Sequence, residues 1–373
     1  MLEIKKYKFY FCPCTQDLYG DECLQHVHEH AEEVVNYLNA SKEVPFEVEL
    51  KPNLLTASMI QQVFNEANND PDCAGIITWA HTFSPSKNYI LGLQDLRKPL
   101  CQFATQYNEE IPYDTIDMDF MNENQAAHGE RELGHIFARM RWNHKVVFGY
   151  WKDPVALTEL GQWQRVAVGI NESRNIRIAR FADTMRNVAV TDGDKIEAQV
   201  KLGWTVDAWP INDLTPYVES VTAAEVKELT DEYYETYGLV LDGRDPEEFR
   251  RHVEVQAAQE IGIERFLVEH NYNAFSDHFG DLGALKQLPS LSIQRLMQKG
   301  FGFGPEGDWK TPGMVRLMKV MTANDPNAKG SALMEDYTYN LVPGKDGILE
   351  SHMSEVDPSM ADGEIKIRAT PLS

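Results

Sequence analysis

Apolar positions in the first half of the chain occur either in short continuous runs or at every third or fourth residue over longer stretches. Helical spacing of this kind covers residues 22–38 and 58–67. Four short runs are β-branched or aromatic and bounded by polar or turn residues, as is typical of strands: residues 7–11, 46–50, 74–79 and 146–150. Strands that alternate with helices predict βαβ units, so we expect a doubly wound, flavodoxin-like α/β domain with a parallel sheet over residues 1–176.

A second α/β domain is expected over residues 177–325. It opens with two β-branched runs, 176–181 and 188–191, and then passes into long helices. The helical segments have charged faces or carry Leu and Met at helical spacing, which is typical of core packing: residues 223–237, 248–271, 292–300 and 313–323.

The pattern changes again after residue 330. Residues 332–342 alternate, residues 343–347 form a turn sequence, and residues 348–356 follow as a second run, which predicts a hairpin. We therefore expect residues 326–373 to be the start of a β-rich, barrel-like third domain.

Composition supports a soluble protein of several domains. A chain of 373 residues exceeds the roughly 250–300 residues that one core serves. The net charge of −23 argues against nucleic acid and anionic membranes as partners and favours small or neutral ligands. Five cysteines, an odd number, and the lack of a long apolar segment predict a cytoplasmic protein.

Ligands of doubly wound sheets bind beyond the carboxyl ends of the strands. Three loops there, residues 15–20, 81–87 and 117–129, mix amide, imidazole and aromatic groups, which suits a sugar site.

Two motifs elsewhere are less informative. Residues 302–307 match the dinucleotide pattern G-x-G-x-x-G, but they follow a predicted helix and contain Pro305 and Glu306, so we reject a nucleotide site. His26 and His30 share a face of a predicted helix, and although a metal pair is possible there, we favour a solvated face.

Glu306, Glu335 and His352 form the set of candidate metal ligands that we consider most informative. Two carboxylates and an imidazole suit a divalent ion such as Mn²⁺. No local helix joins the three positions, so spacing alone does not predict the site, and without further information we favour ordinary surface acids and a histidine at the end of a strand.

The chain resembles the L-arabinose isomerase family, and the resemblance spans essentially its whole length. Its most specific strings include Gln16-Asp17-Leu18-Tyr19-Gly20, and the others are residues 79–85, 116–122, 188–195, 307–311 and 333–339. The resemblance implies an aldose–ketose isomerase that interconverts L-arabinose and L-ribulose and, more weakly, D-galactose and D-tagatose. It implies a divalent ion, Mn²⁺ in the first place, with Co²⁺ or Mg²⁺ as alternatives.

The resemblance also assigns roles to residues. Glu306 and Glu335 are implied to be catalytic, and Glu306, Glu335 and His352 to be metal ligands, together with a further histidine of the family's C-terminal domain. Every histidine of this chain lies at or before position 352. We therefore expect looser metal binding and little or no isomerase activity for the 373-residue form.

Sugar-contacting positions follow from the same resemblance: Gln16, Leu18, Phe83, Gln125, His128, Met185, Phe279 and Met353. The family's site lies at a subunit junction of a homohexamer, so Gln125 and His128 are expected to come from a neighbouring subunit. Without the resemblance, His128 is as often a core or capping histidine, and Phe83, Met185 and Phe279 are core residues.

Two other interpretations stay open. The chain could be a non-catalytic sugar-binding or assembly protein, or a truncated gene product. A sugar-binding protein should bind pentoses equally well with and without EDTA, whereas an isomerase site should lose most of its sugar affinity when the metal is removed.

Overall fold

The computed structural model describes residues 5–334, 336–352, 354 and 356–371. The chain forms two compact units, of which the first covers Lys5–Asn171 and the second begins at Glu172. No helix within the described residues is long and apolar enough to cross a membrane.

The first unit is built on a five-stranded sheet in which all neighbouring strands are parallel. The strand order is β2-β1-β3-β4-β5, so the chain winds outward in both directions from β1. This is the doubly wound sheet that the sequence predicts. Its strands are β1 (Lys8–Cys14), β2 (Glu47–Leu50), β3 (Cys73–Ala80), β4 (Leu100–Ala104) and β5 (Lys145–Phe148).

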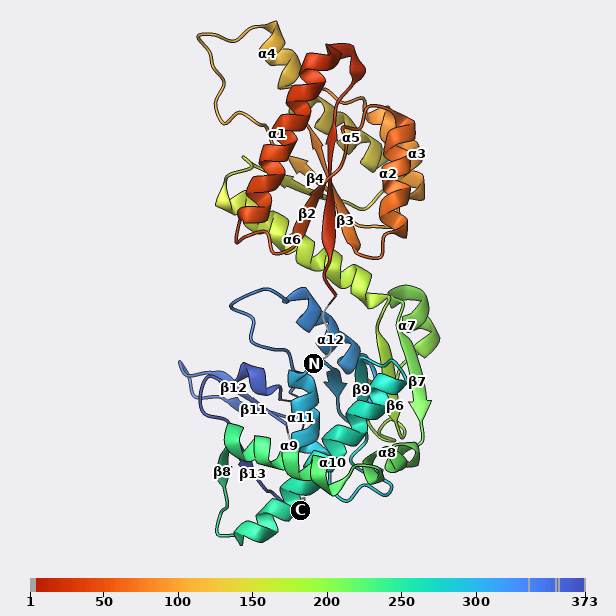
Figure 1. The fold of residues 1–373 in the computed structure, drawn as a ribbon, viewed down its shortest axis with the longest axis vertical. Helices are drawn as coiled ribbons and strands as arrows, with labels where there is room; N and C mark the ends of the chain where they lie inside the picture. Colours follow the sequence, from red (N-terminus) through yellow and green to blue (C-terminus); the bar gives the residue numbers. More distant parts are fainter. Residues whose placement is uncertain (1–4, 335, 353, 355, 372–373) are drawn as a thin grey trace. The chain divides into compact units, whose positions relative to one another are not determined.

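Helices cover both faces of this sheet, with α1 on one side of the strands and α2 and α3 on the other (Figure 1). Among the described residues the helices of the unit are α1 (Gly20–Ala40), α2 (Ala57–Asn69), α3 (Tyr89–Asp95), α4 (Met118–Glu123), α5 (Ala126–Met140) and α6 (Pro154–Ser173), of which the last ends just inside the second unit.

Strand β1 is buried on both faces of the sheet, which accounts for its apolar sequence. Six of its seven residues are buried, and successive side chains point to opposite faces. Tyr10 and Cys12 join the cluster that includes Phe64 of α2, whereas Phe9 packs on Trp163 of α6 with ring centroids 5.2 Å apart. Burial on both faces favours a continuous hydrophobic run over alternation.

The second unit contains a four-stranded parallel sheet with the order β10-β9-β6-β7. Its strands are β6 (Arg177–Phe181), β7 (Thr205–Trp209), β9 (Ala274–Ser276) and β10 (Gly302–Gly304). Phe266 of α10 packs with Phe181 and Phe275 in the main core cluster of the unit. The described helices are α7 (Lys195–Leu202), α8 (Thr215–Glu219), α9 (Ala223–Thr236), α10 (Pro246–Glu269), α11 (Ser290–Gln298) and α12 (Lys310–Met321).

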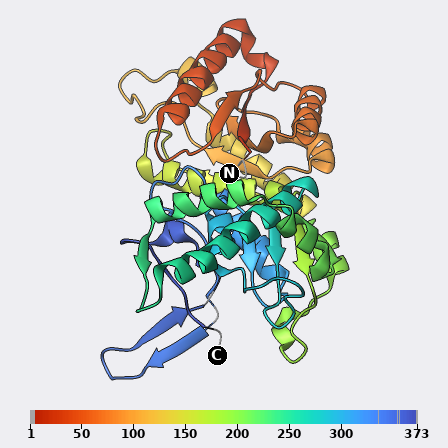
Figure 2. The same ribbon diagram turned by 60° about the horizontal axis from the view of Figure 1, so that its bottom comes forward.

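Two small strand pairs complete the second unit. β11 (Asp336–Asn340) and β12 (Gly347–Ser351) form an antiparallel hairpin, which confirms the predicted one. All ten of their residues are exposed, and the hairpin projects away from the helices of its unit (Figure 2). β8 (Gly238–Val240) pairs in parallel with β13 (Lys366–Arg368).

Most predicted elements are present, and two of the differences are informative. Residues 188–191, the second β-branched run, contain a 3₁₀ helix (Ala189–Thr191) and no strand. Strand β4, which the sequence pattern does not indicate, carries the buried polar residue Gln102 in its centre. The side-chain amide nitrogen of Gln102 donates to the backbone oxygen of Glu130 (3.0 Å), which ties the centre of the strand to α5.

Candidate functional site

Three loops of the second unit follow strands that lie side by side in its sheet. Met185 lies in the loop after β6, Phe279 in the loop after β9 and Glu306 in the loop after β10. Because these strands are parallel, their carboxyl ends meet at the same edge, where ligands of α/β sheets bind. Three of the predicted site residues are thus brought to one edge by topology alone.

Glu306 occupies a strained turn that other loops hold in place. Its φ angle is 64° and that of Gly307 is 73°, both in the left-handed region. The Met185 amide donates to the Glu306 carbonyl oxygen (3.2 Å), and the Gly307 amide donates to the Asp277 carbonyl oxygen (2.7 Å). Left-handed backbone at a non-glycine residue costs of order 1–3 kcal/mol and is concentrated at functional sites.

The residues after this turn anchor it to helix α12. Asp308 is buried and accepts hydrogen bonds from the Lys310 amide (3.0 Å) and the Thr311 hydroxyl (2.9 Å). The Lys310 ammonium lies 2.7 Å from the same carboxylate. These contacts hold Asp308 against the start of α12, and so fix where the loop that carries Glu306 ends.

The glycines of residues 302–307 have a packing role. Gly302 and Gly304 form part of strand β10, whereas the sequence places this motif directly after a helix. A Cβ at Gly302 would lie 2.0 Å from the Pro312 oxygen, and one at Gly304 would lie 2.6 Å from Pro312 Cδ. Helix α12 therefore lies directly on β10, which explains the glycines by close helix–strand packing.

In the first unit the structure brings together the three loops that the sequence singles out. The hydroxyls of Thr15 and Thr82 share a hydrogen bond of 2.5 Å, which joins the loops after β1 and β3. The rings of Phe83 and His128 are 4.5 Å apart, which joins the loop after β3 to the start of α5. Gln16 and the exposed Leu18 lie in the first of these loops.

Helix α5 rests directly on the Phe83 loop. A Cβ at Gly129 would lie 2.9 Å from the Ser84 amide nitrogen, and the Ser86 hydroxyl donates to the Gly129 carbonyl oxygen (2.9 Å). Gln125, at the start of this helix, donates its side-chain amide to Asn122 (3.3 Å). Phe83, Gln125 and His128 therefore occupy one connected piece of structure.

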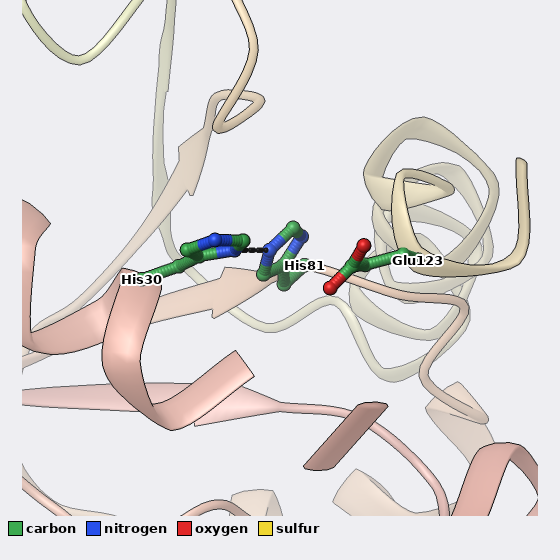
Figure 3. Close-up of side chains that lie close together, drawn as sticks. All are labelled: His30, His81 and Glu123. Carbon is green, nitrogen blue, oxygen red and sulfur yellow. Dashed lines mark hydrogen bonds between the residues drawn. The ribbon is translucent and has the colours of Figure 1, made fainter. Parts of the chain in front are cut away.

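A cluster that the sequence does not predict lies at the same edge of this sheet. His30, His81 and Glu123 come from α1, the loop after β3 and the end of α4, and their side chains gather as Figure 3 shows. Within the described residues this is the one group of three metal-ligating side chains whose ligand atoms all lie within 4.8 Å of one another. The expectation of a solvated His26–His30 face is wrong for His30, because His30 is half-buried against His81.

Tyr107 stacks on His30 and also lines a hollow of about 420 Å³. None of the predicted sugar-contacting residues lines this hollow, so the candidate sugar site does not coincide with it. The remaining lining residues are Glu33, Asn108, Glu109, Glu110, Pro112, Phe120, Tyr150, Trp151 and Lys152.

Of the three predicted metal ligands, the structure places Glu306 and His352, both half-buried. Glu335 and Met353 lie outside the described residues. The donor set of carboxylate and imidazole fits a divalent ion, and the Glu306 turn fits a ligand because the backbone contacts to Met185 and Asp277 hold it rigidly.

Comparison with protein families gives consecutive matches along the whole chain. The L-arabinose isomerase N-terminal domain matches residues 3–175, the L-arabinose isomerase central domain matches residues 177–324, and the L-arabinose isomerase C-terminal domain matches residues 330–373.

Individual relatives agree with these matches. The chain is 49% identical over 373 residues to the L-arabinose isomerase of Geobacillus stearothermophilus, and covers 74% of that protein. It is 49% identical over 372 residues to L-arabinose isomerase 2 of Bacillus licheniformis, and covers 78% of it. In each comparison the match covers 100% of this chain.

Among solved structures, a sugar-binding protein of a sugar ABC transporter from Bacillus halodurans matches 85% of this chain and 87% of its own. The sequence identity is 13% and the TM-score is 0.16, which is too low to bear on either fold or function.

Proposed function

The chain belongs to the L-arabinose isomerase family, and on that premise we propose that it converts L-arabinose to L-ribulose by moving hydrogen between two adjacent carbons. The observation that carries the proposal is the match of 49% identity along all 373 residues. The Glu306 turn, at the carboxyl ends of three parallel strands, supplies a carboxylate where such chemistry needs one.

Two carboxylates can perform the proton transfer. Glu306 and Glu335 are the proposed pair: one, ionised, would take the proton from C2 while the other, protonated, gives a proton to O1, which yields the cis-enediol. The second would then take the proton of the C2 hydroxyl while the first returns its proton to C1, so both end as they began. The turn fixes the backbone from which the Glu306 side chain extends, and a fixed orientation relative to the substrate would lower the barrier of such steps.

Glu306, Glu335 and His352 are also the residues that would hold a divalent ion, for which Mn²⁺ is the first candidate and Co²⁺ or Mg²⁺ the alternatives. When bound, the ion supplies positive charge near the sugar oxygens on which negative charge develops.

The remaining site residues would bind and orient the sugar. Gln16, Gln125 and His128 can exchange hydrogen bonds with hydroxyls, while Leu18 and Phe83 offer apolar surface to the C–H faces of the ring. Met185, Phe279 and Met353 would line the site from the unit that carries Glu306. We propose that Gln125 and His128 reach this site from a neighbouring subunit of a homohexamer.

The test is an assay of ketose formation from L-arabinose by the protein expressed from its own gene, with added Mn²⁺ and with EDTA. Glu306→Gln should lower kcat by about 10²–10⁴-fold, the range for loss of a general acid or base, while leaving the circular dichroism spectrum unchanged. Glu228→Gln, at an exposed position of α9, is the matched control and should keep full activity.

Pentose binding that EDTA does not weaken would contradict the proposal, because an isomerase site should lose most of its sugar affinity when the metal is removed. That result would support a non-catalytic sugar-binding protein instead.

A further inference from the structure

Three segments of the first unit that are far apart in sequence each contribute one metal-ligating side chain to a single point. His30 lies in the middle of α1, His81 is the first residue after β3, and Glu123 is the last residue of α4. The His81 ring lies between the other two side chains in Figure 3. None of the three is among the residues proposed above to bind the sugar or the catalytic ion.

Both imidazole rings are held firmly by aromatic neighbours. The His81 ring stacks on Trp79 with centroids 4.7 Å apart, and the His30 ring stacks on Tyr107 at 3.6 Å with an interplanar angle of 11°. Tyr107 is itself fixed, because its hydroxyl donates to Glu33 (2.5 Å). Ligands whose orientation is set before an ion arrives lose little freedom when it binds.

Burial keeps these rings in the form that binds metal. His81 is only 1% exposed, and burial, aided by the nearby His30, lowers the pKa of His81 to about 3. Burial also lowers the pKa of His30. Both imidazoles are therefore neutral near pH 7, and only a neutral imidazole has a lone pair to donate to an ion.

His81 contacts His30 through one nitrogen of each ring. Its Nε2 lies 2.7 Å from His30 Nδ1, which is a hydrogen bond between the two rings. Its other nitrogen, Nδ1, is buried and has no hydrogen-bond partner of normal geometry among the described residues. The nitrogens that face each other, His81 Nε2 and His30 Nδ1, are therefore the pair available to a shared ion.

The geometry is close to that of an ion site. A four-coordinate ion with metal–nitrogen bonds near 2.0–2.1 Å holds its ligands roughly 3.3 Å apart. The two rings, now 2.7 Å apart, would need to separate by only about 0.6 Å. His26 Nδ1 lies 2.9 Å from Glu123 Oε1 and can orient that carboxylate, as partners of metal-binding carboxylates commonly do.

We propose that His30, His81 and Glu123 form a second metal site, for a zinc-class transition-metal ion, with His26 as the residue that positions the Glu123 carboxylate. Two nitrogens and one oxygen suit Zn²⁺, Co²⁺ or Ni²⁺ better than Mg²⁺ or Ca²⁺, which prefer sites made of oxygen alone. The ion would link α1, the loop after β3 and the end of α4. His81 is two residues from Phe83, and Glu123 is two residues from Gln125, so the linked loops are those that carry proposed sugar contacts.

The test uses the full-length protein with Glu306→Gln as background, so that the proposed catalytic ion does not mask the second site. Zn²⁺ is titrated into metal-free protein by isothermal calorimetry, and the metal content is measured after dialysis. We expect one Zn²⁺ per chain at this site. His30→Gln and Glu123→Gln should each weaken binding by about 100-fold or more, and His26→Gln by about 10-fold.

His28→Gln is the matched control, because His28 is an exposed histidine on the same helix and should leave the titration unchanged. His81→Gln is less suitable, because His81 is buried and its loss can unfold the unit. Circular dichroism checks that the His30 and Glu123 variants remain folded.

Zn²⁺ binding that survives in both the His30 and Glu123 variants, or no binding in the background protein, would overturn the proposal. Either result would leave the isomerase assay unaffected, so the two proposals fail separately.

Discussion

The backbone amide of Met185 donates a hydrogen bond to the carbonyl oxygen of Glu306 across 3.2 Å, which ties the loop after β6 to the loop after β10. The Gly307 amide extends the tie to Asp277 in the loop after β9. Since these contacts use backbone atoms, substitution of the Met185 side chain should leave the turn in place. The position of Glu306 depends instead on whether the backbone can adopt this turn.

Gly307→Ala should therefore disrupt the turn. A Cβ at this position would lie 2.3 Å from the Asp183 carbonyl oxygen and 2.8 Å from Thr184 Cα, in addition to the strain of φ 73°. We expect a loss of at least about 1–3 kcal/mol in urea unfolding and a large drop in kcat. Gly344→Ala is the control, because Gly344 has φ 77° but no atom within 4 Å of the added Cβ. Equal losses in the two variants would show that the contacts at Gly307 are unimportant.

A site shared between subunits predicts complementation between inactive variants. Glu306→Gln and His128→Asn should each be nearly inactive alone. If Glu306 and His128 come from different subunits, unfolding and refolding them together should regenerate intact sites in about a quarter of positions, by random assortment. Ketose formation by the co-refolded mixture, compared with the separately refolded proteins, checks this. A mixture no more active than its components would indicate that each site is built from one chain.

The buried side chain of Glu130 should make the free energy of unfolding fall as the pH rises. Burial raises the pKa of Glu130 to about 8 from its ordinary value of 4.5, and its Oε1 atom has no hydrogen-bond partner among the described residues. The folded form therefore retains a proton that the unfolded form releases. The protonated Glu130 therefore contributes fully to the free energy of unfolding below pH 4.5. This contribution decreases by about 1.4 kcal/mol per pH unit until the pH reaches about 8.

Glu130→Gln should remove this pH dependence. The free energy of unfolding of the variant, measured in urea, should therefore exceed that of the parent protein by an amount that grows between pH 5 and pH 8. Glu32→Gln, at an exposed position of α1, serves as the control. An advantage that is the same at both pH values would rule out a buried, protonated Glu130.

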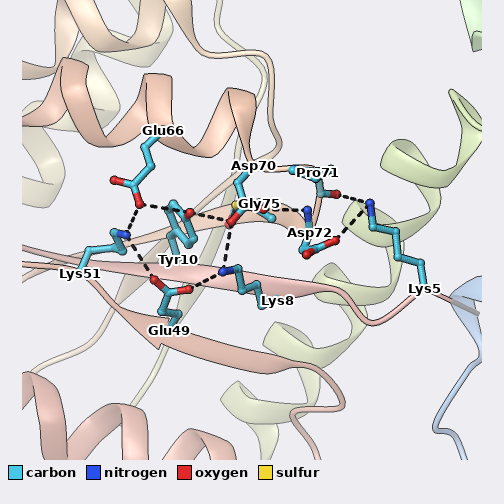
Figure 4. A network of polar contacts seen from close by, with 11 residues as sticks. Lys5, Lys8, Tyr10, Glu49, Lys51, Glu66, Asp70, Pro71, Asp72 and Gly75 are labelled. Carbon is cyan, nitrogen blue, oxygen red and sulfur yellow. Dashed lines mark hydrogen bonds and ion pairs between the residues drawn. The ribbon is translucent and has the colours of Figure 1, made fainter.

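Asp70 should have the opposite effect, because its contribution to the free energy of unfolding is lost as the pH falls. It accepts a hydrogen bond from the Tyr10 hydroxyl (2.8 Å) and pairs with Lys8 (3.1 Å) within the polar network of Figure 4. Burial alone would raise the pKa of Asp70, but the bonds from Tyr10, the Asp72 amide and Lys8 lower it to about 2. This contribution is present above pH 3.8 and is lost as the pH falls through about 2.

Asp70→Asn should lower the free energy of unfolding by on the order of 2 kcal/mol at pH 7. This difference from the parent protein should shrink toward pH 2. Asp72→Asn is the comparison, because the Asp72 side chain is 55% exposed and its pair with Lys5 should contribute little. A cost for Asp70→Asn that persists at pH 2 would mean that packing, and not charge, is responsible.

The hydrophobic pattern predicts the strands whose two faces are both buried, and β1 and β3 are clear for that reason. It does not predict β9 and β10, since three residues are too few to show a period. It also does not indicate β4, where Gln102 interrupts the apolar run and donates a hydrogen bond to the Glu130 carbonyl oxygen in α5.

The sequence likewise predicts one part of the candidate site and not another. The rule that ligands bind at the carboxyl ends of parallel strands is enough to select the loops joined by Thr15–Thr82 and Phe83–His128. It cannot pair His30 with His81, which are 51 residues apart and meet only through the tertiary fold. The spacing of His26 and His30 was the one available signal for this cluster, and it does not reveal the partner.

The close packing of α12 on Gly302 and Gly304 has an entropic consequence. Because the strand has no side chains at these two positions, the helix packs on the strand backbone, and the connecting residues 305–309 have both ends fixed to one rigid body. Their conformational freedom is lost when the protein folds, before any ligand arrives. A ligand of Glu306 should therefore bind with little entropic penalty from this loop, and its affinity should reflect mainly the contacts that it makes.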